Sequence, residues 1–493
     1  VGSMFTLLVL AYYFLPKYLK MGAMTIPSLM EERYGKGTKT MFSLVIVVMY
    51  SILNLPVILY SGAVVFEQIF DISGILGTSK FMAVAILCLI IGIIGGCYAI
   101  FGGLKAVAVS DTINGIGLII GGLMIPFLAL ALLGHETTGG GLVEGVKYLV
   151  QAEPEKLNAW ASWDAAEPAL PWPLIFTGMF FNNLYWWCTN QSFVQRSLAA
   201  KSLKEGQKGA IFCGFLKCLG PLYLVIPGVI AFYLPSIQDK LAAAGSSAID
   251  FAYPALIAEI VPKPVMGFFA AVMFGAILSS FNSVLNSAST IYALDIHRPL
   301  FNPTASDARM VKIGQNFGTV VAVVSTIMSP FMLYMGGITS FVNSAFAAFN
   351  TPIFVCLLCG FFWKKVPAIA AKIVIPVHVV LYFILQFGLR NVIPALNNIH
   401  YLYFTAILFV FDMLLMWVIV KKHPRATDFE LKDVGAVDLT PWKNGKIWAT
   451  VTLLIMVLAY VIFSPLGFGK SEKTTYQNYL ENQTTASVSD SVQ

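Results

Sequence analysis

Long apolar runs dominate this sequence and restrict what it can fold into. Twelve stretches of about 20 mainly apolar residues follow one another along the 493-residue chain, and a helix of that length crosses the hydrocarbon core of a bilayer. Only 11% of the residues are charged, whereas soluble domains carry about 25%. The sequence therefore predicts an all-α polytopic membrane protein with twelve transmembrane segments. The runs lie near residues 1–16, 41–66, 81–101, 107–133, 173–193, 209–234, 265–294, 311–335, 338–362, 366–387, 401–420 and 447–467.

The loops between these runs differ strongly in positive charge. When successive loops are assigned to alternate sides, one side receives 22 of the 31 Lys and Arg residues and the other receives 8. The remaining one, Lys217, falls inside a run. Positive residues are retained on the cytoplasmic side. We therefore expect the loop 421–446 to lie inside, and the loop 135–172 and the tail 469–493 to lie outside.

The reactive side chains in the sequence suggest neither catalysis nor a structural metal. All seven cysteines lie in apolar runs, and the closely spaced Cys356 and Cys359 have no second ligand pair nearby. The apolar runs contain no cluster of His, Cys and acidic residues that would form a catalytic set. We therefore expect that the protein is not an enzyme. The net charge of +6 comes from the loops and requires no nucleic acid partner.

One membrane-embedded stretch, AILSSFNSVLNSASTI at 276–291, is unusually rich in oxygen. Eight of its sixteen residues are Ser, Thr or Asn, and on a helix they cover about half of the circumference. Two interpretations remain open. Small polar residues let helices pack closely and bond back to the preceding turn, or they line a cavity that binds a cation. Because this face carries no acid, a monovalent ion suits it better than a divalent one.

Polar residues also interrupt three other runs. Lys217 lies near the membrane midplane, where a lysine costs on the order of 3 kcal/mol, so it either snorkels to the inner face or faces a polar cavity. The stretch GMFFNNLYWWCTNQSF from residue 178 combines aromatic and amide groups, as in a sugar site or an interfacial aromatic belt. In the run 338–362, Asn343, Asn350 and Pro352 suggest a helix broken around a cavity.

Several of these stretches together resemble the solute:sodium symporter family, which includes the sodium/glucose cotransporters. The resemblance is carried by GGLKA, NNLYWWCTNQ, VQRSLAAKSLKEGQKG, GFLK, LSSFNSVLNSAST and GFFWKK, and it is strongest to bacterial sodium/galactose-type members. It implies two inverted five-helix repeats of the leucine-transporter type, with solute and sodium meeting near the membrane midplane. It also implies that the first family helices are missing, since residues 1–16 match the second core helix, so we expect further sequence upstream.

The same resemblance implies a division of the chain into five parts. They are 1–134 as the remainder of repeat one with core helices 2–5, 135–172 as an extracellular loop, 173–362 as repeat two with core helices 6–10, 363–468 as additional C-terminal transmembrane helices, and 469–493 as an extracellular polar tail.

The resemblance further assigns functional positions residue by residue. Solute contacts are implied for Ser3, Asn54, Asn183, Lys217 and Asn343. An inner gate is implied for Tyr185, Trp186 and Trp187, with Trp186 in place of the usual Tyr. The main sodium site is implied for Ala276 by its carbonyl and for Ser279 and Ser280 by their hydroxyls. A possible second sodium site is implied for Asp111, Asn282 and Ser283, but Asn282 replaces a Ser, so one sodium ion per cycle is favoured.

Together these features predict a sodium-coupled secondary active symporter in the plasma membrane. In a bacterium this would be the inner membrane. It would import a small neutral polyhydroxylated solute, in the first place a sugar, by alternating access. The apolar runs contain no Arg, and carboxylates are commonly captured by Arg, which favours a neutral solute. The alternatives are another solute, such as an inositol, an amino acid or an anionic sugar, and from other classes a channel or a solute sensor.

Overall fold

The computed structural model describes residues 2–152, 154–163, 170–244, 248–334, 338–397 and 399–469. In this part of the chain, helices form almost all of the regular structure. Isolated β-bridges join Ala161 to Pro171 and Ser202 to Asp438. The predicted all-α class is confirmed.

The first third of the chain forms helices with π-helical turns at two places, η1 and η2. The elements are α1 (Ser3–Val9), η1 (Leu10–Phe14), α2 (Leu15–Lys20), α3 (Ile26–Tyr34), α4 (Lys36–Val48), η2 (Met49–Asn54), α5 (Leu55–Phe70), α6 (Ile72–Leu76), α7 (Lys80–Thr138), α8 (Leu142–Ala152) and the 3-10 turn η3 (Pro154–Leu157).

The middle and the C-terminal third contain shorter helices and one long central helix, α17. The middle elements are α9 (Trp172–Phe176), α10 (Gly178–Cys188), α11 (Gln191–Leu198), α12 (Leu203–Cys218), α13 (Gly220–Leu224), α14 (Ile226–Tyr233), α15 (Pro235–Ala244), α16 (Ala248–Ile260), α17 (Lys263–Ile291), η5 (Tyr292–His297) and α18 (Arg298–Phe301). The last elements are α19 (Asp307–Met328), η6 (Ser329–Tyr334), α20 (Ile338–Phe362), α21 (Ile369–Phe383), η7 (Ile384–Leu389), α22 (Arg390–Val392), α23 (Pro394–Asn397), α24 (Tyr401–Lys422) and α25 (Gly445–Ile462).

The number of helices that can span a membrane is lower than predicted. Within the described ranges, 9 helices are long and apolar enough, or 10 if the pair Leu203–Cys218 and Gly220–Tyr233, bent by 47°, is one span. The predicted runs 1–16 and 173–193 are the two that fail. The helix of the first run carries Lys17 and Lys20 in its last turn, and the second run is divided into α9, α10 and α11.

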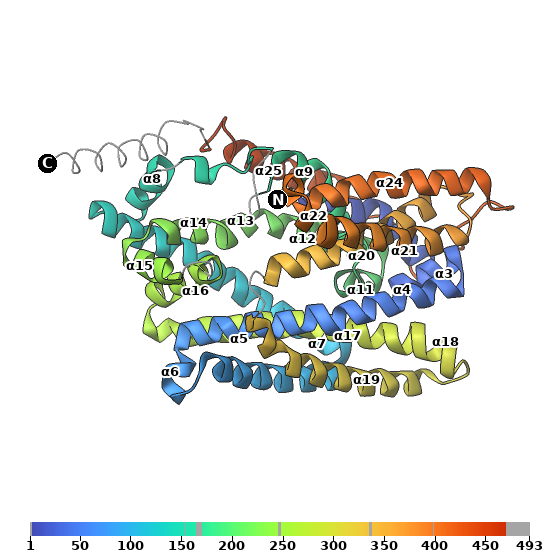
Figure 1. Cartoon of the computed structure of the whole chain (residues 1–493), viewed down its shortest axis with the longest axis horizontal. Coiled ribbons are helices and arrows are strands. Elements are labelled where there is room, and N and C mark those ends of the chain that lie inside the picture. The colour runs from blue at the N-terminus through green and yellow to red at the C-terminus, as the bar shows by residue number, and fades with distance from the viewer. Residues whose placement is uncertain are drawn as a thin grey trace.

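Helix α17 lies at the centre of the helical packing. It contacts α5, α7 and α19, and Figure 1 shows α5, α17 and α19 running alongside one another in the lower half of the view. Its apolar side, with Phe281, Leu285 and Ile291, is fully buried in the main hydrophobic core. The oxygen-rich side of the same helix therefore faces away from this core and toward the cavities described below.

Hydrogen bonds join several of the loops that the charge count assigns to one side. The segment between α24 and α25 forms a strap across the basic loops. Its backbone amides at Phe429 and Val434 donate to the carbonyls of Lys364 and Lys20, at 3.1 and 3.0 Å, and its Asp438 carbonyl accepts from the Leu203 amide at 2.9 Å. On the other side, the loop after α8 contacts the end of α25, where the Ala159 amide donates to the Phe463 carbonyl at 2.7 Å.

Candidate functional site

The predicted sodium ligands lie where α7 and α17 approach closely. The Asn114 side chain of α7 donates to the Gly275 carbonyl at 3.2 Å, and a Cβ at residue 275 would lie 2.5 Å from Asn114 Oδ1. A larger residue at 275 would therefore require the Asn114 side chain to move. One turn further on, the Ser280 hydroxyl donates to the Ala276 carbonyl at 3.1 Å, so two of the predicted ligands are already adjacent.

The hydroxyl groups of α17 also bond back along the helix. Ser283 donates to the Ser279 carbonyl at 2.6 Å and Ser287 donates to the Ser283 carbonyl at 2.8 Å. The packing interpretation of the oxygen-rich face therefore accounts for some of these hydroxyls.

A central cavity of about 730 Å³ joins many of the predicted site residues. It brings together one predicted solute residue, two gate residues and four predicted sodium residues. They are Asn54, Trp186, Trp187, Ser279, Ser280, Asp111 and Ser283. The cavity also reaches Ser197, Ala200 and Glu205, around the start of α12. It therefore extends toward the side that holds the basic loops.

The other predicted site residues do not line this cavity. Lys217 Nζ lies 4.5 Å from the ring centroid of Trp187, which does line the cavity. Tyr185 and Asn282 are buried, Asn343 is exposed, and Ser3, Asn183 and Ala276 are partly exposed. The roles assigned to these seven residues, like those of the residues that line the cavity, stay predictions.

A helix break places the two tryptophans and α11 around the cavity. Helix α10 ends at Cys188, whose carbonyl accepts from the Tyr18 hydroxyl at 2.6 Å. Asn190 then caps α11: its Oδ1 accepts from the Ser192 amide at 3.0 Å and from the Tyr50 hydroxyl at 2.7 Å. Because these contacts satisfy backbone groups that a break leaves open, the chain can interrupt its helix inside a membrane protein.

The structure adds a residue that the sequence did not predict for the site. Arg196 of α11 lines the central cavity, forms an ion pair with Asp111 and donates to the Ser283 hydroxyl at 2.6 Å. It lies three residues beyond the apolar run 173–193, which is why a search of the runs for Arg missed it. The signal was the basic residue five positions after the polar stretch CTNQ.

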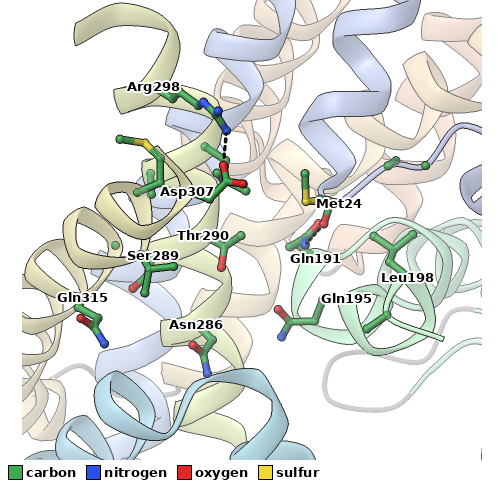
Figure 2. A pocket seen from close by; sticks show the side chains of 18 of the residues that line it. Met24, Gln191, Gln195, Leu198, Asn286, Ser289, Thr290, Arg298, Asp307 and Gln315 are labelled. Atoms are coloured by element: carbon green, nitrogen blue, oxygen red, sulfur yellow. Dashed lines mark hydrogen bonds and ion pairs between the residues drawn. The ribbon is translucent and has the colours of Figure 1, made fainter. Parts of the chain in front are cut away.

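A second cavity of about 770 Å³ lies on the other side of α11. The oxygen-rich face of α17 contributes Asn286, Ser289 and Thr290 to it, and α11 contributes Gln191 and Gln195; Figure 2 shows these side chains around one space. Arg298 and Asp307, which pair at 3.1 Å, also line it. The face therefore divides, with Ser279, Ser280 and Ser283 in the central cavity and its C-terminal part in the second cavity.

One predicted feature near the site is wrong. Helix α20 is continuous from Ile338 to Phe362, with Pro352 inside it, whereas the sequence suggested a broken helix. Asn350 donates to Asn182 Oδ1 at 3.2 Å, so this asparagine joins α20 to α10. Membrane helices tolerate an internal proline when neighbouring helices support the freed backbone groups.

Comparisons with known proteins show which family the sequence is similar to. The model of the sodium:solute symporter family matches residues 1–373. The symporter YidK of Escherichia coli (strain K12) is 40% identical over 468 residues, which cover 95% of this chain and 78% of that protein. The sodium/glucose cotransporter of Vibrio parahaemolyticus is 31% identical over 429 residues, or 84% of this chain and 75% of that protein.

More distant relatives share the fold or a large part of the sequence. The human sodium/myo-inositol cotransporter 2 is 30% identical over 444 residues, which cover 83% of this chain and 63% of that protein. A solved structure of a substrate-bound, outward-open Na⁺-coupled sialic acid symporter superimposes with a TM-score of 0.72 at 20% identity, over 87% of this chain and 84% of that one. At that identity the match supports the fold alone.

Proposed function

The chain belongs to the sodium:solute symporter family, and on this basis we propose that it imports a small neutral polyhydroxylated solute, in the first place a sugar, together with sodium. It is a sodium-coupled solute symporter and a multi-pass membrane protein, not an enzyme. The identity of the solute and the positions of its contacts are our proposal. They rest on one observation, the chemistry of the central cavity.

The lining of the central cavity suits a neutral solute with hydroxyl groups. Trp186 and Trp187 offer aromatic faces and Asn54 offers an amide with both donor and acceptor atoms, which is how proteins hold sugar rings. Ser279 and Ser280 lie in the same cavity. A sodium ion held there and a solute held near the tryptophans would share one space, which is the condition for coupling their transport.

The charged groups of the cavity argue against an anionic solute. Arg196, the guanidinium that could capture a carboxylate, is paired with Asp111. Lys217 does not line the cavity, and its ammonium group lies 4.5 Å from the ring centroid of Trp187. Neither cation is presented to the cavity without a partner, so a carboxylate would have to displace an existing interaction.

Transport assays with purified protein test this proposal. We expect liposomes containing the protein to accumulate a labelled neutral sugar or inositol when sodium is higher outside, and to accumulate none when potassium replaces sodium. The solutes to compare are glucose, galactose, myo-inositol, sialic acid and proline. Stronger uptake of sialic acid or proline than of every neutral polyol would contradict the proposed solute class.

Accumulation against the solute gradient separates a symporter from a channel. Sodium moving inward yields about 2.3 kcal/mol per charge for each 100 mV of membrane potential, which is enough to concentrate a neutral solute severalfold. A channel would bring the solute only to equal concentrations. The sodium ionophore monensin is the control, because it dissipates the sodium gradient and should release the accumulated solute.

A further inference from the structure

A histidine and an aspartate form a pair inside the membrane-embedded helices, away from both cavities. His378 Nδ1 of α21 and Asp412 Oδ2 of α24 lie 2.6 Å apart, and both side chains are 0% exposed. Neither residue lines the central or the second cavity. The pair therefore lies outside the solute and sodium sites proposed above.

The pair lies deep in the apolar layer. His378 follows the start of α21 (Ile369–Phe383) and Asp412 precedes the end of α24 (Tyr401–Lys422), and the helical rise places them roughly 14 and 15 Å from those two ends. Both ends lie on the side of the basic loops. A hydrocarbon core of about 30 Å has its midplane at this depth. Bulk water is absent there, so a charge must be balanced by neighbouring groups.

The side chains around the pair supply no positive charge apart from the imidazole. Helix α20 packs against both α21 and α24, and its thiols Cys356 and Cys359 interact electrostatically with Asp412. The Tyr382 ring stacks parallel to the imidazole of His378 with the ring centroids 6.2 Å apart. Thiols and phenols are neutral or negative. Within the described ranges, His378 is the group whose charge stabilises the Asp412 carboxylate.

The other elements that touch this helix pair do not change the balance. Helices α9 and α10 pack on α24, and η7 contacts α21 and α24; their sequences contain no Lys, Arg, His, Asp or Glu. Arg33 of α3 interacts with Cys359, but its guanidinium donates to the Gly360 and Trp363 carbonyls at the end of α20, at 2.8 Å each. The imidazole and the carboxylate must therefore balance each other.

Electrical neutrality of the pair requires one proton more than a neutral imidazole and a carboxylate carry together. The added proton gives either an imidazolium whose Nδ1–H donates to the carboxylate, or a carboxyl group whose Oδ2–H donates to the neutral imidazole. Both forms have no net charge, whereas loss of the proton leaves one negative charge in a medium that cannot solvate it. The separation of 2.6 Å is short, as in a charge-assisted hydrogen bond.

Polar atoms continue from the pair toward the opposite end of α21. His378 Nε2 and Asp412 Oδ1 are buried without a hydrogen-bond partner among the described residues, and a bound water molecule would satisfy such atoms. Tyr382 and Gln386 follow His378 at intervals of four residues on one side of α21 and η7, and all three are buried. This row gives a proton a polar route between the pair and the end of α21 that faces away from the basic loops.

We propose that His378 and Asp412 form a proton-binding site in the interface between α21 and α24, where one proton is shared by the imidazole and the carboxylate. The ligand of this site is a proton taken from water. The packing of α21 against α24 consequently depends on a bound proton, separately from sodium and solute. The inference goes beyond the proposed transport function and does not rest on the identity of the solute.

Unfolding of the purified full chain by sodium dodecyl sulfate at different pH values tests the proposal. Between about pH 7.5 and about pH 9, an unfolded chain carries neutral histidine and ionised aspartate, so only the folded pair holds the shared proton. The folding equilibrium constant of the wild type, divided by that of Asp412→Asn, should therefore fall about tenfold for each pH unit as the pH rises. Asp412→Asn leaves no carboxylate to neutralise, and other titrating groups cancel in the ratio. The double variant His378→Gln/Asp412→Asn is the control and should follow the pH dependence of Asp412→Asn.

A ratio that does not change with pH would overturn the proposal. If Asp412→Asn does not fold, spectra of the wild type decide. At about pH 8.5, where free imidazole and carboxyl groups have lost their protons, they should show either a doubly protonated histidine in nitrogen-15 NMR or the infrared band of a protonated carboxyl group. Absence of both signals would refute the site. Failure of sodium-driven uptake of every solute would contradict the proposed function and leave the proton site standing.

Discussion

Ser279 and Ser280 are consecutive on α17, so their side chains leave the helix about 100° apart, yet both line the central cavity. Both side chains can reach the cavity because it contacts a broad part of the helix surface and not one narrow stripe. The Ser280 hydroxyl returns to the Ala276 carbonyl, and a sodium ion that binds here would have to share or replace that hydrogen bond. The two hydroxyls and the carbonyl remain our predicted ligands.

Loss of either hydroxyl should weaken sodium binding. We expect Ser279→Ala and Ser280→Ala each to raise the sodium concentration for half-maximal uptake by roughly 5- to 150-fold, the equivalent of about 1–3 kcal/mol for one lost polar partner. Ser287→Ala is the control: Ser287 belongs to the same helix and donates to the Ser283 carbonyl at 2.8 Å, but does not line the central cavity. Unchanged sodium dependence in both serine variants would place the ion elsewhere.

We expect Lys217 to influence the solute site through its contact with Trp187. Its ammonium group lies 4.5 Å from the ring centroid of Trp187, a distance typical of a cation–π interaction. Lys217→Ala should abolish uptake because Trp187 loses its cation–π partner, while the purified protein stays folded and monodisperse. Lys217→Arg can keep the cation over the ring and should retain part of the uptake. Lys204→Ala, an exposed lysine on the same helix, is the control and should transport normally.

The residues of the site were predictable from sequence to different degrees. Ser279 and Trp187 stand in long stretches that resemble the family, so their place in the cavity followed from that resemblance. Arg196 stands in such a stretch too, but its position after an apolar run suggested a loop at the membrane surface. Its side chain reaches the cavity because the chain changes direction at Asn190, where α11 begins. A hydropathy profile contains no information about that change of direction.

The break between α10 and α11 is the element that shapes both cavities. Arg196 and Gln195 are neighbours on α11, and they line the central and the second cavity respectively. This short helix is therefore the wall between the two spaces. Its orientation depends on the cap at Asn190, which is 1% exposed and accepts hydrogen bonds from Tyr50 and Ser192.

Removing this cap should destabilise the protein more than removing one of its partners. For Asn190→Ala we expect a loss of about 2–4 kcal/mol, from the helix cap and from the Tyr50 hydroxyl that remains buried without its acceptor. Tyr50→Phe removes only one donor and should cost about 1 kcal/mol. Thermal unfolding in detergent, followed by size-exclusion chromatography, gives the ranking. Equal losses in the two variants would show that Asn190 does not support the break.

The whole molecule has two faces with different charge, and their sidedness can be tested by labelling. The strap after α24 lies with the basic loops, and the loop after α8 lies at the opposite end of α25. A single cysteine in place of Lys432 should react with an impermeant maleimide only from the cytoplasm, and one in place of Val143 only from outside. Both positions are exposed. Labelling of both from the same side would refute the orientation derived from the Lys and Arg count.

Sequence patterns predicted the large-scale architecture better than the number of its spans. Membrane insertion, helical class and the grouping of the loops follow from apolar runs and positive charge, which are properties of whole segments. Within the described residues the count of twelve was too high, in the case of the run 173–193 because a run reports composition and not continuity. Residues 173–193 are apolar enough to span, but the helix ends at Cys188, a local event decided by hydrogen bonds from distant residues such as Tyr18.

The strap also sets an order for the biosynthesis of the protein. Its amides and carbonyls pair with Lys20, Leu203 and Lys364, which leave the ribosome long before residues 429–438 do. The basic loops therefore lack their hydrogen bonds to the strap during most of translation. These hydrogen bonds form only after α24 has been inserted. Because these hydrogen bonds use backbone groups, they can still form when side chains in the strap are substituted. Ribosome-bound chains that end before residue 425 should expose the Lys20 segment to added protease, and completed chains should protect it.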